Sequence, residues 1–188
     1  MFMSVHSRVI GALLLVCAVT MASAMASRPE PYAEWIAVDD LTGEKRDQVL
    51  SFRRSRVPSK SEVPFPRFPD ARLLVGDTTP IATVKPRDRT PMLGLLLVSK
   101  ADPTHVARWY EGKLPGYSRF EYMVEGKRKI LFIQGLKSFD VDKDSHVLTS
   151  TPHVIVTEIS SALRPLAVGY PTIIELSYRQ WTKRARLE

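Results

Sequence analysis

Cysteine is almost missing from this 188-residue sequence, and its one cysteine, Cys17, lies in an apolar stretch near the N-terminus. If that stretch is removed, the remaining chain has no disulfide and no thiol chemistry. The folded part must then be stabilised by packing alone. This excludes the disulfide-stapled class of small secreted domains.

The usual spacings of catalytic and metal-binding residues are missing as well. The sequence has no Gly-x-Ser-x-Gly elbow to expose a nucleophilic serine. Outside the N-terminal stretch the histidines are His105, His146 and His153, and no two of them form the i, i+4 pair of a zinc site. No internal repeat or low-complexity tract occurs. These absences favour a domain that is not an enzyme and that needs no cofactor.

The N-terminus has the three parts of a secretory signal peptide. Arg8 supplies the positive charge, residues 9–19 form an uncharged apolar run, and two Ala-x-Ala sequences follow. Small side chains at such sites fit the signal peptidase pocket. We expect cleavage after Ala24 or Ala26 and a periplasmic or secreted product with no transmembrane span.

Two alternatives to simple cleavage remain open. Residues 9–26 could stay as a membrane anchor, although the second half of this stretch is rich in Thr, Ser, Ala and Met and gains little from hydrocarbon. Cys17 could instead be lipidated. Lipoprotein signals place a small residue before the cysteine, whereas this chain has Val16 there. Cleavage without lipidation is the favoured interpretation.

The charge is strongly basic, with 27 Lys and Arg against 20 Asp and Glu, a net charge of +7. Two clusters hold much of the excess: Lys45, Arg46, Arg53, Arg54, Arg56 and Lys60, and then Lys183, Arg184 and Arg186. For an exported protein the expected anionic partner is an envelope protein or a lipid surface. No nucleic-acid partner is expected. The simpler explanation of the two basic clusters is that they are solvated faces that only aid solubility.

Four regions are expected: a signal peptide at 1–26, an N-terminal extension and linker at 27–62, an α+β domain at 63–181, and a basic tail at 182–188. Three prolines mark the start of the domain, where an extended entry is pinned by Phe65 and Phe68. Whether residues 28–60, with Trp35 and a possible helix near 43–54, dock on the domain stays open.

The expected fold is an antiparallel sheet of about five to six strands with one main amphipathic helix packed on one face. The helix has Asp102 as N-cap and ends at Pro115-Gly116. Residues 135–151 are expected to be a polar excursion between strands. Apolar or alternating patterns predict strands near 71–75, 92–98, 120–124, 129–134, 153–159 and 172–178.

Within that excursion, Asp140, Asp142 and Asp144 present oxygens at alternate positions, as calcium loops do. However, the sixth position is Ser145 in place of Gly, and the twelfth is Thr151 in place of Glu. A solvated loop with Asp turn caps is therefore favoured, and calcium binding is the alternative.

Two constellations could support hydrolysis. His146 could act as a base oriented by Asp144, although no nucleophile is placed by the sequence. Glu158 and Glu175 lie in the last two predicted strands and could face each other as a carboxylate pair. Two acidic residues in such strands are more commonly ordinary surface carboxylates than a catalytic pair.

Aromatic residues around the exit of the helix form the candidate partner-binding surface. An exposed cluster there would mark an interface, whereas a buried one would complete the core. With three basic residues of the extension, the candidate binding set is Trp109, Tyr117, Phe120, Arg53, Arg54 and Arg56.

The entry Val63-Pro64-Phe65-Pro66 and the run from Trp109-Tyr110 to Leu114-Pro115-Gly116 are similar to motifs of uncharacterised exported bacterial α+β proteins. The similarity covers about residues 63–135 and departs by inserting Arg67-Phe68-Pro69 into the entry. It implies an envelope protein with an α+β domain. Because the motifs are structural, the resemblance implies no reaction and no functional residue.

From these patterns we expect an exported binding or accessory module without catalytic activity. The first alternative is a carrier that holds a lipid or another amphiphile in a cavity between sheet and helix. The second alternative is a hydrolase that uses His146 and Asp144.

The export prediction can be checked by N-terminal sequencing of the protein recovered from an envelope fraction. We expect the first residue to be Met25 or Ser27, because these follow the two Ala-x-Ala sites. An intact Met1 on a cytosolic product would contradict the prediction.

Overall fold

The computed structural model describes residues 29–37, 56–78 and 92–179. The predicted signal peptide, the possible helix at 43–54 with Arg53 and Arg54, and the basic tail lie outside the described residues. The main compact unit begins at Pro31, well before the expected boundary at residue 63.

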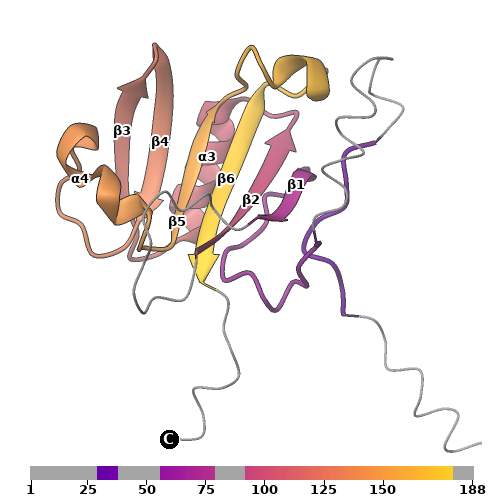
Figure 1. Ribbon diagram of the computed structural model, residues 1–188, viewed down its shortest axis with the longest axis horizontal. Helices are drawn as coiled ribbons and strands as arrows, with labels where there is room; N and C mark the ends of the chain where they lie inside the picture. The colour runs from indigo at the N-terminus through magenta and orange to yellow at the C-terminus, as the bar shows by residue number, and fades with distance from the viewer. Residues whose placement is uncertain (1–28, 38–55, 79–91, 180–188) are drawn as a thin grey trace, which may run out of the picture. The chain divides into compact units, whose positions relative to one another are not determined.

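Six strands form one sheet, in the spatial order β1-β2-β6-β5-β4-β3 (Figure 1). Every neighbouring pair is antiparallel, which confirms the expected antiparallel sheet of five to six strands. The strands are β1 (Arg72–Thr78), β2 (Met92–Ser99), β3 (Ser118–Val124), β4 (Lys127–Ile133), β5 (His153–Glu158) and β6 (Thr172–Arg179).

The predicted helix is α3 (Pro103–Lys113), and its start follows from local chemistry. The Asp102 side chain accepts a hydrogen bond from the His105 amide at 2.9 Å, and proline occupies the first turn. Val106 and Tyr110 are completely buried and share one apolar cluster with side chains of the sheet such as Phe132.

A second helix, α4 (Val141–Leu148), occupies the segment that was expected to be a polar excursion. The segment is a polar excursion between β4 and β5, as expected, but the favoured solvated loop is wrong at Val141–Leu148. Asp140 acts as an N-cap, and its carboxylate accepts a hydrogen bond from the Asp142 amide at 3.0 Å. Val147 and Leu148 of α4 pack against a small buried cluster that includes Leu131 of β4.

The N-terminal segment docks on the sheet and wraps around its β1 edge. Trp35 forms a parallel bridge with Leu73, supported by hydrogen bonds from the Ile36 amide to the Leu73 carbonyl (3.0 Å) and from the Leu73 amide to the Glu34 carbonyl (2.7 Å). Tyr32 belongs to the apolar cluster that includes α3, whereas Ile36 belongs to a different cluster with β1, β2 and the chain around η3 (Arg164–Leu166).

Substitutions at Tyr32 can measure how much the docked N-terminal segment contributes to the free energy of unfolding. Its hydroxyl is buried and has no hydrogen-bond partner among the described residues, and burial raises its pKa well above the usual value. We expect Tyr32→Ala to lower the free energy of unfolding by about 3–5 kcal/mol, through loss of a buried ring. Tyr32→Phe should be neutral or slightly stabilising, because it removes a polar group that is buried without a partner.

Urea unfolding of both variants, monitored by circular dichroism, measures the difference. A Tyr32→Ala protein as stable as the wild type would show that the docked segment contributes little.

Candidate functional site

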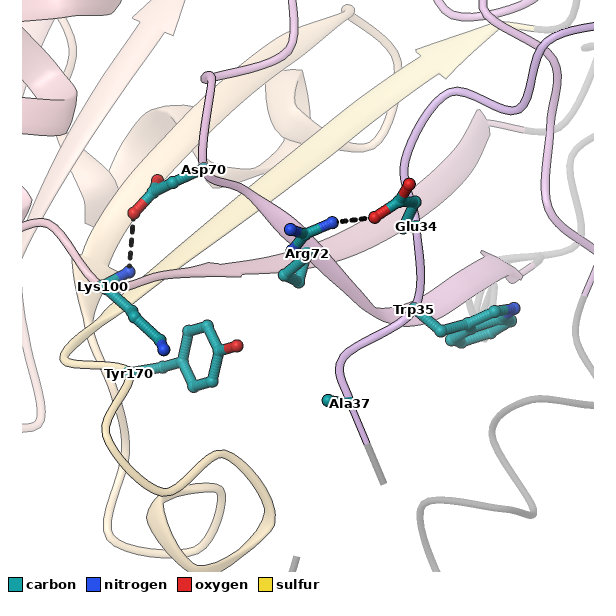
Figure 2. Close-up of a pocket in the computed structure, with 7 residues that line it drawn as sticks. All are labelled: Glu34, Trp35, Ala37, Asp70, Arg72, Lys100 and Tyr170. Atoms are coloured by element: carbon teal, nitrogen blue, oxygen red, sulfur yellow. Dashed lines mark hydrogen bonds and ion pairs between the residues drawn. The ribbon is translucent and has the colours of Figure 1, made fainter. Parts of the chain in front are cut away.

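A polar pocket of about 400 Å³ lies beside the wrapped β1 edge (Figure 2). Its lining comes from four stretches that are distant in the sequence: the docked N-terminal segment, the chain that enters β1, the residue that follows β2, and the loop before β6. The lining residues are Glu34, Trp35, Ala37, Asp70, Arg72, Lys100 and Tyr170.

Asp70 fixes the geometry of one wall. Its carboxylate accepts hydrogen bonds from the Ser99 hydroxyl at 2.7 Å and from the Lys100 amide at 3.2 Å. The Ser99 hydroxyl in turn accepts a hydrogen bond from the Ala101 amide at 3.0 Å. Because its oxygens are engaged in this way, Asp70 holds the turn after β2 against the start of β1.

Arg72 and Glu34 form an ion pair across the β1 edge. Their side chains are 41% and 71% exposed, so water screens the attraction and the pair adds little stability. An arginine has five N–H donors. Arg72 can therefore keep Glu34 and still donate to a ligand in the pocket.

Lys100 carries the pocket's least compensated charge. Its amine lies 5.4 Å from the centre of the Tyr170 ring, and Figure 2 shows it directed towards that ring. A cation over an aromatic face is stabilised without losing its charge. In the described part of the chain no carboxylate lies within ion-pair distance of this amine.

The pocket therefore suits an anionic group. It combines a lysine that has no acidic partner among the described residues, an arginine with spare donors, and the aromatic rings of Trp35 and Tyr170. Its volume is within the range of small-molecule sites, roughly 300–1,000 Å³. Across the described ranges, no group of three His, Cys, Asp or Glu side chains is arranged to hold a metal ion.

The predicted aromatic surface is divided between the two faces of the sheet. Trp109 packs on Phe68 with ring centres 5.3 Å apart, and both belong to the buried region that includes α3. Tyr117 belongs to the same region. Phe120 points to the other face and packs on Phe139 at 6.0 Å. The expectation of one aromatic cluster is therefore wrong, because β3 directs alternate residues to opposite faces.

Arg56 belonged to the same predicted binding set. It forms an ion pair with Glu62 at 2.7 Å, and this pair and the Ser59 hydrogen bonds lower the pKa of Glu62 to about 2. Arg53 and Arg54 lie outside the described residues.

The calcium candidates lie at the start of α4. Asp144 accepts a hydrogen bond from the Asp140 amide at 2.9 Å, and Asp140 also pairs with Lys143 at 3.2 Å. The ring of His146 bonds to the Lys143 carbonyl at 3.0 Å. The structure thus gives Asp144 and His146 separate backbone partners and shows no bond between the two side chains.

Glu158 and Glu175 cannot act as a facing pair. Glu175 is the cross-strand partner of Ile155, and Glu158 is the partner of Thr172. Positions 172 and 175 are an odd number of residues apart on β6, so the two carboxylates project from opposite faces of the sheet.

The pairing of β5 with β6 instead brings several polar side chains together on the face of the sheet where α4 lies. His153 lies opposite Ser177, with Glu175 two residues away on β6. The His153 ring bonds to the Thr151 carbonyl at 2.8 Å. Burial and, second, the Glu175 charge raise the pKa of nearby Tyr122 to about 12. These residues are far apart in the sequence, and only strand pairing brings them together.

No protein-family model, no curated protein sequence and no solved structure matches this chain. What the structure itself shows is an antiparallel sheet with two helices, compatible with α+β, and a small pocket lined by charged and aromatic side chains. The resemblance to exported bacterial proteins stays a prediction. Within the described residues no helix is both long and apolar enough to cross a membrane.

His153 gives a pH-dependent prediction. It is 2% exposed, and burial lowers its pKa, so the folded state favours the neutral ring. The resulting stability is complete above the unfolded-state pKa of about 6.5 and is lost as the pH falls through the lowered folded-state value.

We expect the free energy of unfolding to decrease between pH 7.5 and pH 5, and His153→Gln to reduce this dependence. His146→Gln is the matched control, since His146 is exposed on α4. Urea titrations across this pH range test the point, and equal pH dependence in wild type and His153→Gln would refute it.

Proposed function

We propose that this chain is an exported envelope-binding or accessory module without catalytic activity, in which α3 packs on one face of the sheet. The pocket at the β1 edge would hold an anionic group of an envelope partner. The observation that carries this proposal is the Lys100 amine, which lies over the Tyr170 ring with no carboxylate partner in the described residues.

Rigidity supports a recognition role for this pocket. Asp70 ties the turn that carries Lys100, and the backbone bridge at Leu73 ties the segment that carries Glu34 and Trp35. A site whose walls are fixed before binding loses less conformational entropy when the ligand enters. The predicted export and the net charge of +7 agree with an anionic partner in the envelope.

The core packing favours this proposal over an amphiphile carrier. Val106, Tyr110, Phe132 and Val154 are all at most 1% exposed and belong to one cluster between α3 and the sheet. Burial this complete argues against a lipid-sized cavity at this place in the described part of the chain. The hydrolase alternative lacks a bonded base and orienter, because His146 and Asp144 each bond to the backbone.

Binding can be measured by ¹H–¹⁵N nuclear magnetic resonance titration of the mature protein with two probes. Glycerol 3-phosphate represents a phospholipid headgroup, and a tetraglutamate peptide represents an acidic protein segment. We expect one probe to shift the amide signals of Arg72 and Lys100. Lys100→Gln should weaken that binding by about tenfold or more, as expected for a lost charged contact.

Lys113→Gln is the matched control, because it removes the same charge from an exposed position at the end of α3. Equal weakening by both variants would show that net charge alone attracts the probe. Failure of both probes to shift the pocket signals would contradict the proposed site.

A further inference from the structure

The two edges of the sheet differ, and the β3 edge lacks the cover that the β1 edge has. β1 is bridged by Trp35, whereas β3 pairs only with β4 among the described residues. Uncovered edge strands expose unpaired backbone donors and acceptors that can bind another strand. β3 has seven residues, long enough for such pairing.

The hairpin between β3 and β4 shows which backbone groups face outward. Its two-residue turn has positive φ at both central positions, 51° at Glu125 and 72° at Gly126, which is the type I′ geometry. In such a hairpin the closing pair, Val124 and Lys127, is hydrogen-bonded, and every second pair along the ladder repeats this pattern.

Residues 118, 120, 122 and 124 therefore bond to β4, and Arg119, Glu121 and Met123 present their N–H and C=O groups at the outer edge. None of these three has a backbone hydrogen bond to another described residue. Met123 is also 59% exposed, which is unusual for a large apolar side chain in this protein. The outer edge thus offers three donor–acceptor pairs in a row.

The charges along this edge are complementary to a second copy of themselves. Within one copy Glu121 already pairs with Arg119 and, at 2.6 Å, with Arg128 of β4, so a second copy would extend this group of charges. If two β3 strands pair antiparallel about a two-fold axis at Phe120, Arg119 lies opposite Glu121 of the second copy, and Glu121 opposite its Arg119. Arg119 and Glu121 both direct their backbone N–H and C=O groups to the outer edge, so this register also forms backbone hydrogen bonds between the two copies. An edge protected against pairing commonly carries charges of one sign, which would repel a second copy.

In the same register, aromatic side chains of the two copies also come into contact. The two Phe120 rings become a directly opposed, non-hydrogen-bonded pair, in which side chains approach most closely. Phe120 already packs on Phe139 at 6.0 Å and lies half-buried beside Tyr122, so the second ring would extend an existing aromatic group. Ser118 would lie opposite Tyr122 of the second copy.

We propose that β3 is a homodimer interface, in which two copies pair antiparallel through this edge and form one continuous sheet. The two-fold arrangement needs only one self-complementary patch on each copy. A partner protein's strand would use the same donors, but in this register a second copy always places a glutamate opposite Arg119 and an arginine opposite Glu121.

The test measures the mass of the mature protein by size-exclusion chromatography with light scattering, over a concentration series. We expect the wild type to shift towards the dimer mass as concentration rises. Glu121→Arg should weaken dimerisation by at least about tenfold, because like charges then oppose each other across the axis. The double swap Arg119→Glu with Glu121→Arg should restore the dimer, since complementarity returns.

Glu111→Arg on the exposed side of α3 is the charge-matched control and should leave the dimer intact. Circular dichroism melts identify a variant that fails to fold. Hydrogen exchange adds a local readout: the amides of Arg119 and Glu121 should become protected as concentration rises. A wild type that stays monomeric with these amides unprotected, or a double swap that fails to restore a folded variant's dimer, would overturn the proposal.

Discussion

The pairing of β6 with both β2 and β5 is the interaction on which the rest of this structure depends. All eight residues of β6 pair with β2, and six of them also pair with β5. Without β6 the sheet would separate into the β1–β2 pair and the β3–β4–β5 meander. The fully buried side chains of Ile174, Leu176 and Tyr178 supply much of the apolar contact beneath the sheet.

The sequence predicts the features that depend on local chemistry. Asp102 followed by proline sets the start of α3, and the alternation in β3 gives its half-buried pattern. Phe65 and Phe68 were predicted to pin the proline-rich entry, and both are buried. The signal for α4 was too faint, because its few apolar residues are only partly buried and Asp140 resembles a loop residue as much as a cap.

The pocket could not be predicted, because no local spacing records it. Glu34, Asp70, Lys100 and Tyr170 become neighbours only when the N-terminal segment wraps around β1 and the chain before β6 returns to the same edge. The prediction of one aromatic cluster failed for a related reason: Tyr117 and Phe120 are close in the sequence but lie on opposite faces of the sheet. The pocket lining and the placement of the aromatic side chains both depend on contacts between residues that are distant in the sequence.

β6 is the last in sequence of the six described strands, and this constrains when the sheet can form. A ribosome releases the chain from its N-terminus, so β6 emerges after the five described strands that it unites. Until then β2 and β5 each lack a neighbour, and exposed edges of this kind are prone to wrong association. The nascent polypeptide must therefore wait, shielded or kept extended, until residue 179 has left the exit.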